Sequence, residues 1–435
     1  MDLSFNPSIS TLQDHSLLVD RLTNLPDELL IRIISSLPTK YALATCNLSK
    51  RMRHIFPWIT SLSFDYSHIY PCRRHCYEIE CLRPFVTFVD NVLHAYKSRY
   101  LTRFRLGVGC VPCRLPDLKS TQLNAWISFA LARCGLKELD LCLHLKDRSH
   151  IQLPPEIFTC ETLEVLKLDI NIGLDQVFDM PSFRLPNLKR FHLYVESLSK
   201  DEFLTSLVSS CPLLEELSVE ALWIYGCNIS ISSTSLRRLC LRFYNSTVFL
   251  RIHTPNLLDL KYTDNLVLEY SVTTMNYLVK AHINIFSTIR RVYCLDILSL
   301  SRSFSNVQHL CLIISSSEIL QYRDVKDRLP VFRNLKWLEL GIARNLYWNG
   351  LLFAFLNFSP VLETLVFLQG ISSESTDAVL RKREDIRKAL LKECSVFSCR
   401  SDGNTQHIAE FTKGLTHLFI RSARKVDRLS SDADD

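Results

Sequence analysis

The chain has 435 residues, and 47% of them are hydrophobic. It contains 10 glycines and carries a formal net charge of +6. A chain of this length exceeds one compact core and indicates two or three domains or one elongated array. The low glycine content argues against glycine-rich nucleotide loops, and positive charge spread along the whole chain argues against a nucleic-acid partner.

The first residues, 1–19, are polar with an acidic start and no apolar run, which predicts a flexible tail and no signal peptide. Without secretion, the 16 cysteines are expected to be reduced thiols. Cys240 and Cys311 lie on apolar stripes, where cysteine packs as a small hydrophobe. We expect a protein of the cytoplasm, the nucleus or both.

A short amphipathic helix is predicted between two prolines, over 25–38. Pro26 suits the first helical turn, where a backbone N–H would have no partner within the helix. Asp27 and Glu28 complement the positive end of the helix dipole. Pro38 ends the helix. The apolar residues between these ends follow at helical spacing: Leu29, Leu30, Ile33, Ile34 and Leu37.

Two more short helices are predicted before Pro57. Three helices in about 35 residues bury little surface, and so small a unit needs support from outside. Their exposed apolar face is therefore expected to pack on the rest of the chain or on another protein.

A six-residue pattern, apolar-x-x-apolar-x-apolar, recurs through the rest of the chain. Its starts are Leu136, Leu163, Leu188, Leu214, Leu236, Leu257, Leu278, Val307, Leu335 and Leu362, with outlying copies at Leu101 and Leu415. The mean spacing of about 25 residues is typical of leucine-rich repeats. Alternation within the pattern predicts a strand with one buried face, and stacking of neighbouring repeats buries that face.

We therefore expect an α/β fold in which an irregular leucine-rich-repeat solenoid spans 101–421. Strands line its concave side, and helices or turns lie behind them. A connector is expected at 61–100 and a flexible acidic tail at 422–435.

Strand positions that alternate with the buried ones are expected to face outward and to bind a target. They mix both charges, which suits a protein target better than a polyanion, and Tyr, Trp and Arg often anchor interfaces. An ordinary solvated face is the alternative reading. The nominated residues are Arg190, His192, Tyr194, Glu216, Ser218, Glu220, Arg238, Arg242, Asp259, Lys261, Lys280, His282, Trp337 and Glu339.

Other chemistry is weakly indicated. The apolar segment 351–371 has the length of a membrane span, but Pro360 interrupts it and a repeat begins at Leu362, so no membrane partner is expected. The cysteines at 72–81 and 110–113 lack the paired spacing of a zinc site. No catalytic motif or phosphate loop is found. We expect no catalytic residue, no metal and no cofactor, and hence no enzyme.

The stretch DRLTNLPDELLIRIISSLPTKYALATCNLSKRMRHIF, residues 20–56, resembles the F-box motif. With the repeats behind it, including CPLLEEL, the chain is similar to the plant F-box/leucine-rich-repeat proteins. The resemblance implies an F-box at 20–60 and a substrate receptor of SCF-type cullin ubiquitin ligases. The F-box would bind the SKP-family adaptor and, through it, the cullin, while the repeats hold an unidentified target protein. Carried over by position, the adaptor-facing residues are Leu25, Pro26, Leu29, Leu30, Ile33, Leu37, Pro38, Leu43 and Leu48.

Two positions depart from the family pattern. Tyr41 stands where an acidic residue is usual, and Met52 where a tryptophan is usual, so docking is expected to be weakened but retained. The further small domain called FBD has no convincing copy. Three alternatives follow: a repeat scaffold with a degenerate F-box, a soluble enzyme, and a receptor gated by a small molecule.

Overall fold

The computed structural model describes residues 25–66, 82–109, 118–144, 152–178, 182–199, 202–264, 267–285, 300–314, 329–342, 349–369 and 417–422. Residues 1–19 and 423–435 of the predicted tails and the cysteines at 72–81 and 110–113 lie outside these ranges. Residues 370–416, where a degenerate FBD would lie, are outside them as well.

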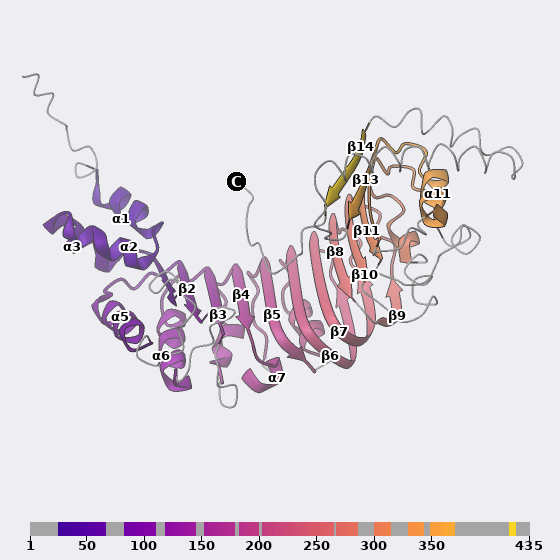
Figure 1. Cartoon of the computed structure of the whole chain (residues 1–435). Helices are drawn as coiled ribbons and strands as arrows, with labels where there is room; N and C mark the ends of the chain where they lie inside the picture. Colours follow the sequence, from indigo (N-terminus) through magenta and orange to yellow (C-terminus); the bar gives the residue numbers. More distant parts are fainter. Residues whose placement is uncertain are drawn as a thin grey trace, which may run out of the picture.

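Three short helices precede one long parallel sheet, which curves along the molecule (Figure 1). The helices are α1 (Asp27–Ser35), α2 (Thr39–Ala44) and α3 (Lys50–Ile55), with 3-10 turns η1 (Thr45–Asn47) and η2 (Phe56–Trp58). The strands follow one another in chain order, except that β9 lies off this path and pairs with β7. This arrangement confirms the predicted fold of an F-box followed by a repeat solenoid.

The strands have the following bounds: β1 Ser61–Asp65, β2 Arg103–Val108, β3 Glu138–Leu143, β4 Val165–Ile170, β5 Arg190–Leu198, β6 Glu216–Ser232, β7 Arg238–His253, β8 Asp259–Asp264, β9 Val267–Val272, β10 Lys280–Ile285, β11 His309–Ile314, β12 Trp337–Ile342, β13 Thr364–Gln369 and β14 His417–Ser422.

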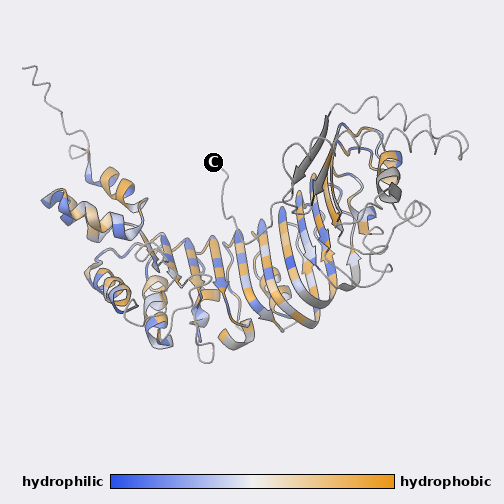
Figure 2. Ribbon diagram, viewed as in Figure 1, coloured by the Kyte–Doolittle hydropathy of each residue, from blue (hydrophilic) through white to orange (hydrophobic). Residues whose placement is uncertain are grey.

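Strands β2 to β8 and β10 to β14 each begin two residues after the first apolar residue of a repeat. In the repeat at Leu136, for example, β3 starts at Glu138, and Leu136, Leu139 and Leu141 are fully buried. Parallel pairing is in register, so Leu139 lies beside Leu166 of β4. Buried residues therefore form continuous rows through the solenoid, and apolar and polar positions alternate along the strands (Figure 2).

The sheet begins earlier than predicted, within the expected connector at 61–100. Strand β1 pairs in parallel with β2, so the first repeat starts directly after the F-box. Ile59, Leu62 and Phe64 carry the same apolar-x-x-apolar-x-apolar spacing and are fully buried. This copy of the repeat pattern was missed because it overlaps the end of the predicted F-box.

Helices and turns cover the outer side of the sheet (Figure 1). They are α5 (Leu82–Ala95), α6 (Ser120–Leu131), η4 (Pro155–Phe158), α7 (Leu174–Val177), α8 (Glu202–Ser209), η5 (Ser301–Phe304) and α11 (Asn349–Phe358). Phe158 packs edge to face against Phe178, Phe183 and Phe203. In the described ranges no helix has both the length and the apolar character that a membrane span needs.

Strands β6 and β7 are much longer than their neighbours. The pairing between them shifts between Tyr225 and Cys227, where Gly226 has a φ of +67°. The second half of β7 then pairs with β9. This extension was not predicted.

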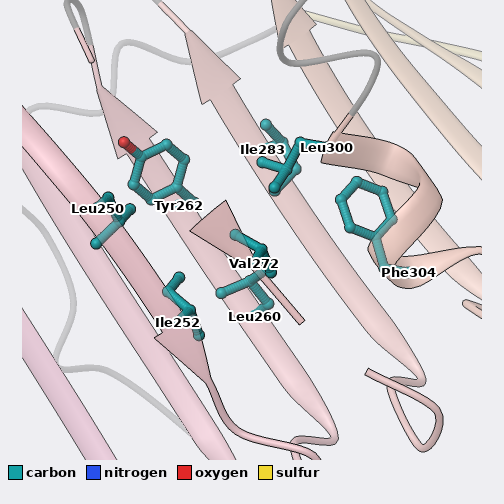
Figure 3. Close-up of a pocket in the computed structure, with 8 residues that line it drawn as sticks. All are labelled: Leu250, Ile252, Leu260, Tyr262, Val272, Ile283, Leu300 and Phe304. Carbon is teal, nitrogen blue, oxygen red and sulfur yellow. The ribbon is translucent and has the colours of Figure 1, made fainter. Parts of the chain in front are cut away.

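A small cavity lies between β7, β8, β9, β10 and η5 (Figure 3). It is lined by apolar side chains and Tyr262, and its volume of about 10 Å³ has room for at most one water. A cavity of this size does not hold a small-molecule ligand.

The F-box and the solenoid share one hydrophobic core, which includes Leu30, Ile34 and Leu62. Hydrogen bonds cross the junction. The Thr60 N–H donates to Ser35 Oγ at 2.8 Å, and the Ser63 N–H donates to Thr39 Oγ1 at 2.7 Å. The three helices are therefore held against the first strand of the array.

Candidate protein-interaction surfaces

The F-box helices expose several large apolar side chains. On α1, Leu29 and Ile33 are 45% and 44% exposed, and their spacing of four residues places them on one helix face. Leu43 and Leu48 are also exposed. We call these four residues the exposed F-box aliphatics. Large apolar side chains left in water by so small a unit indicate a partner surface.

Leu30 does not belong to that surface, although it was nominated to face the adaptor. It is fully buried, as is Ile34 on the same face of α1. Since both pack into the shared core, an adaptor cannot touch Leu30 without opening the domain. Among the other nominated residues, Pro26 is exposed and Leu25, Leu37 and Pro38 are half-buried.

The two departures from the family pattern have different structural consequences. Met52 is buried in the F-box core, and its N–H donates to the N-cap Ser49 Oγ at 3.1 Å. The methionine therefore changes the packing of the F-box and not its surface. Tyr41, in contrast, is exposed on α2 and alters the surface directly.

The strand residues nominated for target binding all lie exposed or half-buried on the sheet, and none of them is buried. Arg190 of β5, Glu216 of β6 and Arg238 of β7 are register partners in one row. A second row contains His192, and a third contains Tyr194. We call the surface formed by these three rows the strand face.

Opposite charges on the strand face pair between neighbouring strands. Arg238 Nη2 lies 2.8 Å from Glu216 Oε2, and Arg242 Nη1 lies 3.1 Å from Glu220 Oε2. The hydroxyl of Tyr244 donates to the same Glu220 carboxylate at 3.2 Å. Each such pair contributes at most about 1 kcal/mol because the groups remain partly solvated.

The ion pairing continues toward the F-box. Arg103 of β2 lies 2.7 Å from Glu138 of β3, and Arg105 of β2 lies 3.4 Å from Asp65 of β1. Because neighbouring strands are about 4.8 Å apart and in register, alternating charge at one position produces these contacts. The strand face therefore carries positive and negative side chains side by side, and not a patch of one charge.

Trp337 lies toward the C-terminal end of the strand face. Its Nε1–H donates to Glu339 Oε1 at 2.9 Å, and its ring centroid lies 6.3 Å from that of His309. An indole held in place in this way loses little side-chain entropy when it meets a partner.

Known protein families match both the N-terminal helices and the repeat region of this chain. The family model for the F-box domain matches residues 22–61, and the model described as FBD-associated F-box protein At5g56370, LRR repeats, matches 123–282. The chain is 32% identical over 375 residues to F-box/LRR-repeat protein At4g14103 of Arabidopsis thaliana, covering 82% of this chain and 93% of that protein. F-box/LRR-repeat protein At4g14096 of the same plant is 31% identical, over 85% and 78% of the two chains.

The chain belongs to the plant F-box/leucine-rich-repeat family. These similarities extend over most of the chain, so they include the repeats as well as the short F-box.

One exposed aromatic of this F-box/leucine-rich-repeat protein was not anticipated. Trp58, in η2, is 51% exposed at the end of the F-box. The helices predicted from the sequence end before Pro57, whereas η2 continues to Trp58. The signal in the sequence was a tryptophan between the last F-box helix and the first strand, and tryptophan is a frequent interface anchor.

Two histidines on the strand face have lowered pKa values. Burial lowers the pKa of His282, and the nearby Lys261 lowers it further. Burial also lowers the pKa of His192, although the Glu216 carboxylate acts in the opposite direction. Both imidazoles are therefore neutral at neutral pH.

We expect the protein to lose stability as the pH falls from about 7.5 to 5.5, with His282 contributing to the loss. Below its ordinary pKa of about 6.5, an unfolded histidine binds a proton that the folded His282 resists, so acid favours the unfolded chain. His282→Gln should show a shallower decline in urea unfolding midpoint. The exposed His54→Gln is the control and should follow the wild type. Identical pH profiles for His282→Gln and the wild type would contradict the assignment.

Proposed function

We propose that this chain is the substrate-recognition subunit of an SCF-type cullin ubiquitin ligase, acting in the cytoplasm, the nucleus or both. The observation that carries the proposal is the set of exposed F-box aliphatics on a domain of the F-box family. A domain of this size that also shares its core with a repeat array has those side chains free for a partner.

The SKP-family adaptor is the proposed partner of this surface, and the cullin is reached through it. The proposed contact residues are Leu25, Pro26, Leu29, Ile33, Leu37, Pro38, Leu43 and Leu48, with Trp58 added and Leu30 removed. Their mixture of exposed and half-buried apolar side chains fits the apolar centre of a docking surface.

The strand face is the proposed site of a target protein. The chain itself supplies no catalytic group in this scheme, and other subunits transfer ubiquitin. Its contribution is proximity, because a target held on the strand face has a raised effective concentration near the transfer machinery.

Coexpression with SKP-family adaptors followed by size-exclusion chromatography tests the proposal. We expect a stable one-to-one complex with at least one adaptor. If no adaptor co-purifies with the folded chain, the repeat scaffold with a degenerate F-box becomes the better description. The exposed Tyr41 favours that second function, because it places an aromatic ring where the family usually carries an acid.

Reversing the charge of Arg238, Arg242 and Lys261 together is expected to reduce target capture at least tenfold, as repulsion across an interface costs several kcal/mol. Tyr194→Ala with Trp337→Ala should weaken capture through lost apolar contact. Quantitative mass spectrometry of proteins co-purifying with the adaptor-bound chain measures both effects.

A matched variant, with Arg99, Lys119 and Arg333 changed to glutamate, makes the same charge change on exposed residues outside the strands. It should capture targets like the wild type. Unchanged capture in both strand-face variants would move the binding surface to another part of the chain.

A further inference from the structure

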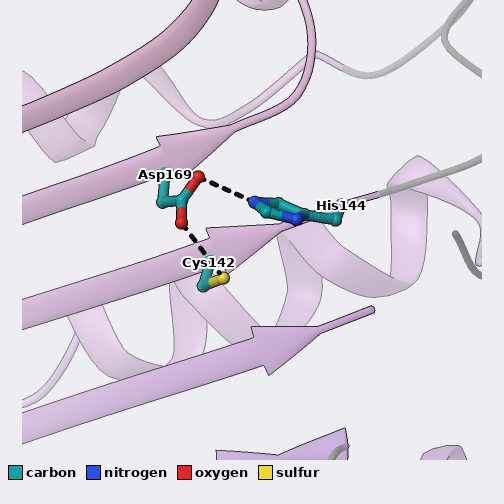
Figure 4. Close-up of side chains that lie close together, drawn as sticks. All are labelled: Cys142, His144 and Asp169. Carbon is teal, nitrogen blue, oxygen red and sulfur yellow. Dashed lines mark hydrogen bonds and ion pairs between the residues drawn. The ribbon is translucent and has the colours of Figure 1, made fainter. Parts of the chain in front are cut away.

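Three side chains that can each bind a metal meet at the ends of β3 and β4 (Figure 4). Cys142 and Asp169 are register partners on these neighbouring strands, and His144 directly follows β3. None of the three was nominated from the sequence.

The three groups are already in contact. Asp169 Oδ1 lies 2.7 Å from His144 Nε2, and the Cys142 thiol donates to Asp169 Oδ2 at 3.5 Å. One ligand atom from each residue lies within 4.8 Å of the others. The His144 side chain is only 8% exposed, and its Nδ1 is buried with no hydrogen-bond partner among the described residues.

The backbone around His144 leaves it little freedom. Its N–H donates to the Val108 carbonyl at 2.8 Å. A side chain at Gly109 would overlap the carbonyl oxygen of His144, since an added Cβ would lie 2.1 Å from it. The ring centroid of Tyr194 lies 6.5 Å from that of His144. The His144 backbone is thus fixed beside β2, and its imidazole is held by the contact with Asp169.

Thiolate, imidazole and carboxylate are the three ligand types of zinc, with bond lengths of about 2.0–2.3 Å. In a tetrahedral site these lengths place ligand atoms about 3.3–3.7 Å apart. The histidine and aspartate would need to separate by less than about 1 Å to reach that geometry.

We propose that Cys142, His144 and Asp169 bind one Zn²⁺ or a similar divalent transition-metal ion. With three protein ligands the fourth position stays open to water or to a side chain of a bound protein, as at zinc sites that exchange ligands. The Cys142 thiol releases its proton to solvent when it coordinates. The ion would link β3 to β4 at the edge of the strand face, beside Tyr194.

Cysteine alkylation tests the proposal at the level of the single residue. The full chain is treated with iodoacetamide in the presence of Zn²⁺ or of a chelator, and the modification of each cysteine is followed by mass spectrometry. We expect Zn²⁺ to slow alkylation of Cys142 at least tenfold. Cys240, also half-buried on the strand face, is the internal control and should react at the same rate under both conditions.

Asp169→Asn should abolish the protection of Cys142, because removal of a ligand weakens metal binding by more than about tenfold. Equal alkylation of Cys142 with and without Zn²⁺ would overturn the proposal, and so would equal protection of Cys240.

Cobalt provides a second readout. Co²⁺ bound to a thiolate gives a sulfur-to-metal charge-transfer absorption, which we expect in the wild type and in Cys240→Ser but not in Cys142→Ser. Circular dichroism confirms that each variant is folded. An absorption that persists in Cys142→Ser would place the cobalt on other cysteines and overturn the assignment.

Discussion

Replacing Leu29 and Ile33 with aspartate is expected to abolish adaptor binding while the repeat array stays folded. Both side chains are nearly half exposed on one face of α1, so the free chain tolerates the charges. In a complex the two carboxylates would be buried without partners, which costs several kcal/mol. That cost corresponds to a loss of affinity of about 10³-fold or more, measurable by calorimetry with a purified SKP-family adaptor.

Two control substitutions make the result specific. Leu213→Asp places one such charge on a leucine that is 48% exposed just before β6, and it should leave adaptor binding intact. Leu30→Asp places the charge in the shared core, and it should unfold the F-box. If the double variant binds the adaptor like the wild type, then α1 does not face the adaptor.

Gly109→Ala is expected to destabilise the molecule by more than about 3 kcal/mol. Gly109 has a φ of +87°, which L-residues rarely adopt, and an added Cβ would lie 2.1 Å from the backbone oxygen of His144. A backbone atom cannot rotate away as a side chain would, so the β2–β3 pairing must open. Because each repeat contacts only its neighbours, the loss should appear first as faster amide hydrogen exchange in β2 and β3.

Gly226→Ala separates the two causes of that loss. Gly226 also has a positive φ, of +67°, but an added Cβ there meets nothing within 4 Å. Only the conformational cost of about 1–2 kcal/mol remains. If both alanine variants lose stability equally, then the contact with His144 contributes nothing.

The strand positions could be predicted because the repeat pattern is local. Each strand needs Leu or its equivalents at fixed spacing, and the motif that starts at Leu136 overlaps β3, which begins two residues later at Glu138. In-register stacking then determines which side chains share a row, so the composition of the strand face follows from the sequence as well.

Contacts between residues that are distant in the sequence could not be predicted from that pattern. Adjacent Leu29 and Leu30 are chemically identical, and only the packing of α1 against the array decides that Leu30 is inside. Cys142 and Asp169 are separated by a full repeat, and they meet because register pairs β3 with β4. Aligning the repeats position by position would have revealed that pair, but not His144, which lies beyond the strand end.

The extension of β6 and β7 was missed for a different reason. The repeat pattern is six residues long, and these strands continue well past it. Cys227, Ile229 and Ile231 alternate with polar residues and are buried, so the signal for a longer strand was present. Gly226 interrupts this alternation, and a glycine at such a position is typical of a strand end. In the structure its positive φ allows β6 to continue, and pairing with β7 resumes after a shift in register.

Because the F-box and β1 share one core, each strand lies at a fixed distance from the F-box. Each successive strand adds about 4.8 Å to that distance along the sheet. A protein that shifts its anchor by one strand therefore changes its distance from the F-box by one fixed increment, without any change in the F-box itself. Where a ligand sits along the rows thus determines which of its own surface groups come within reach of whatever the F-box binds.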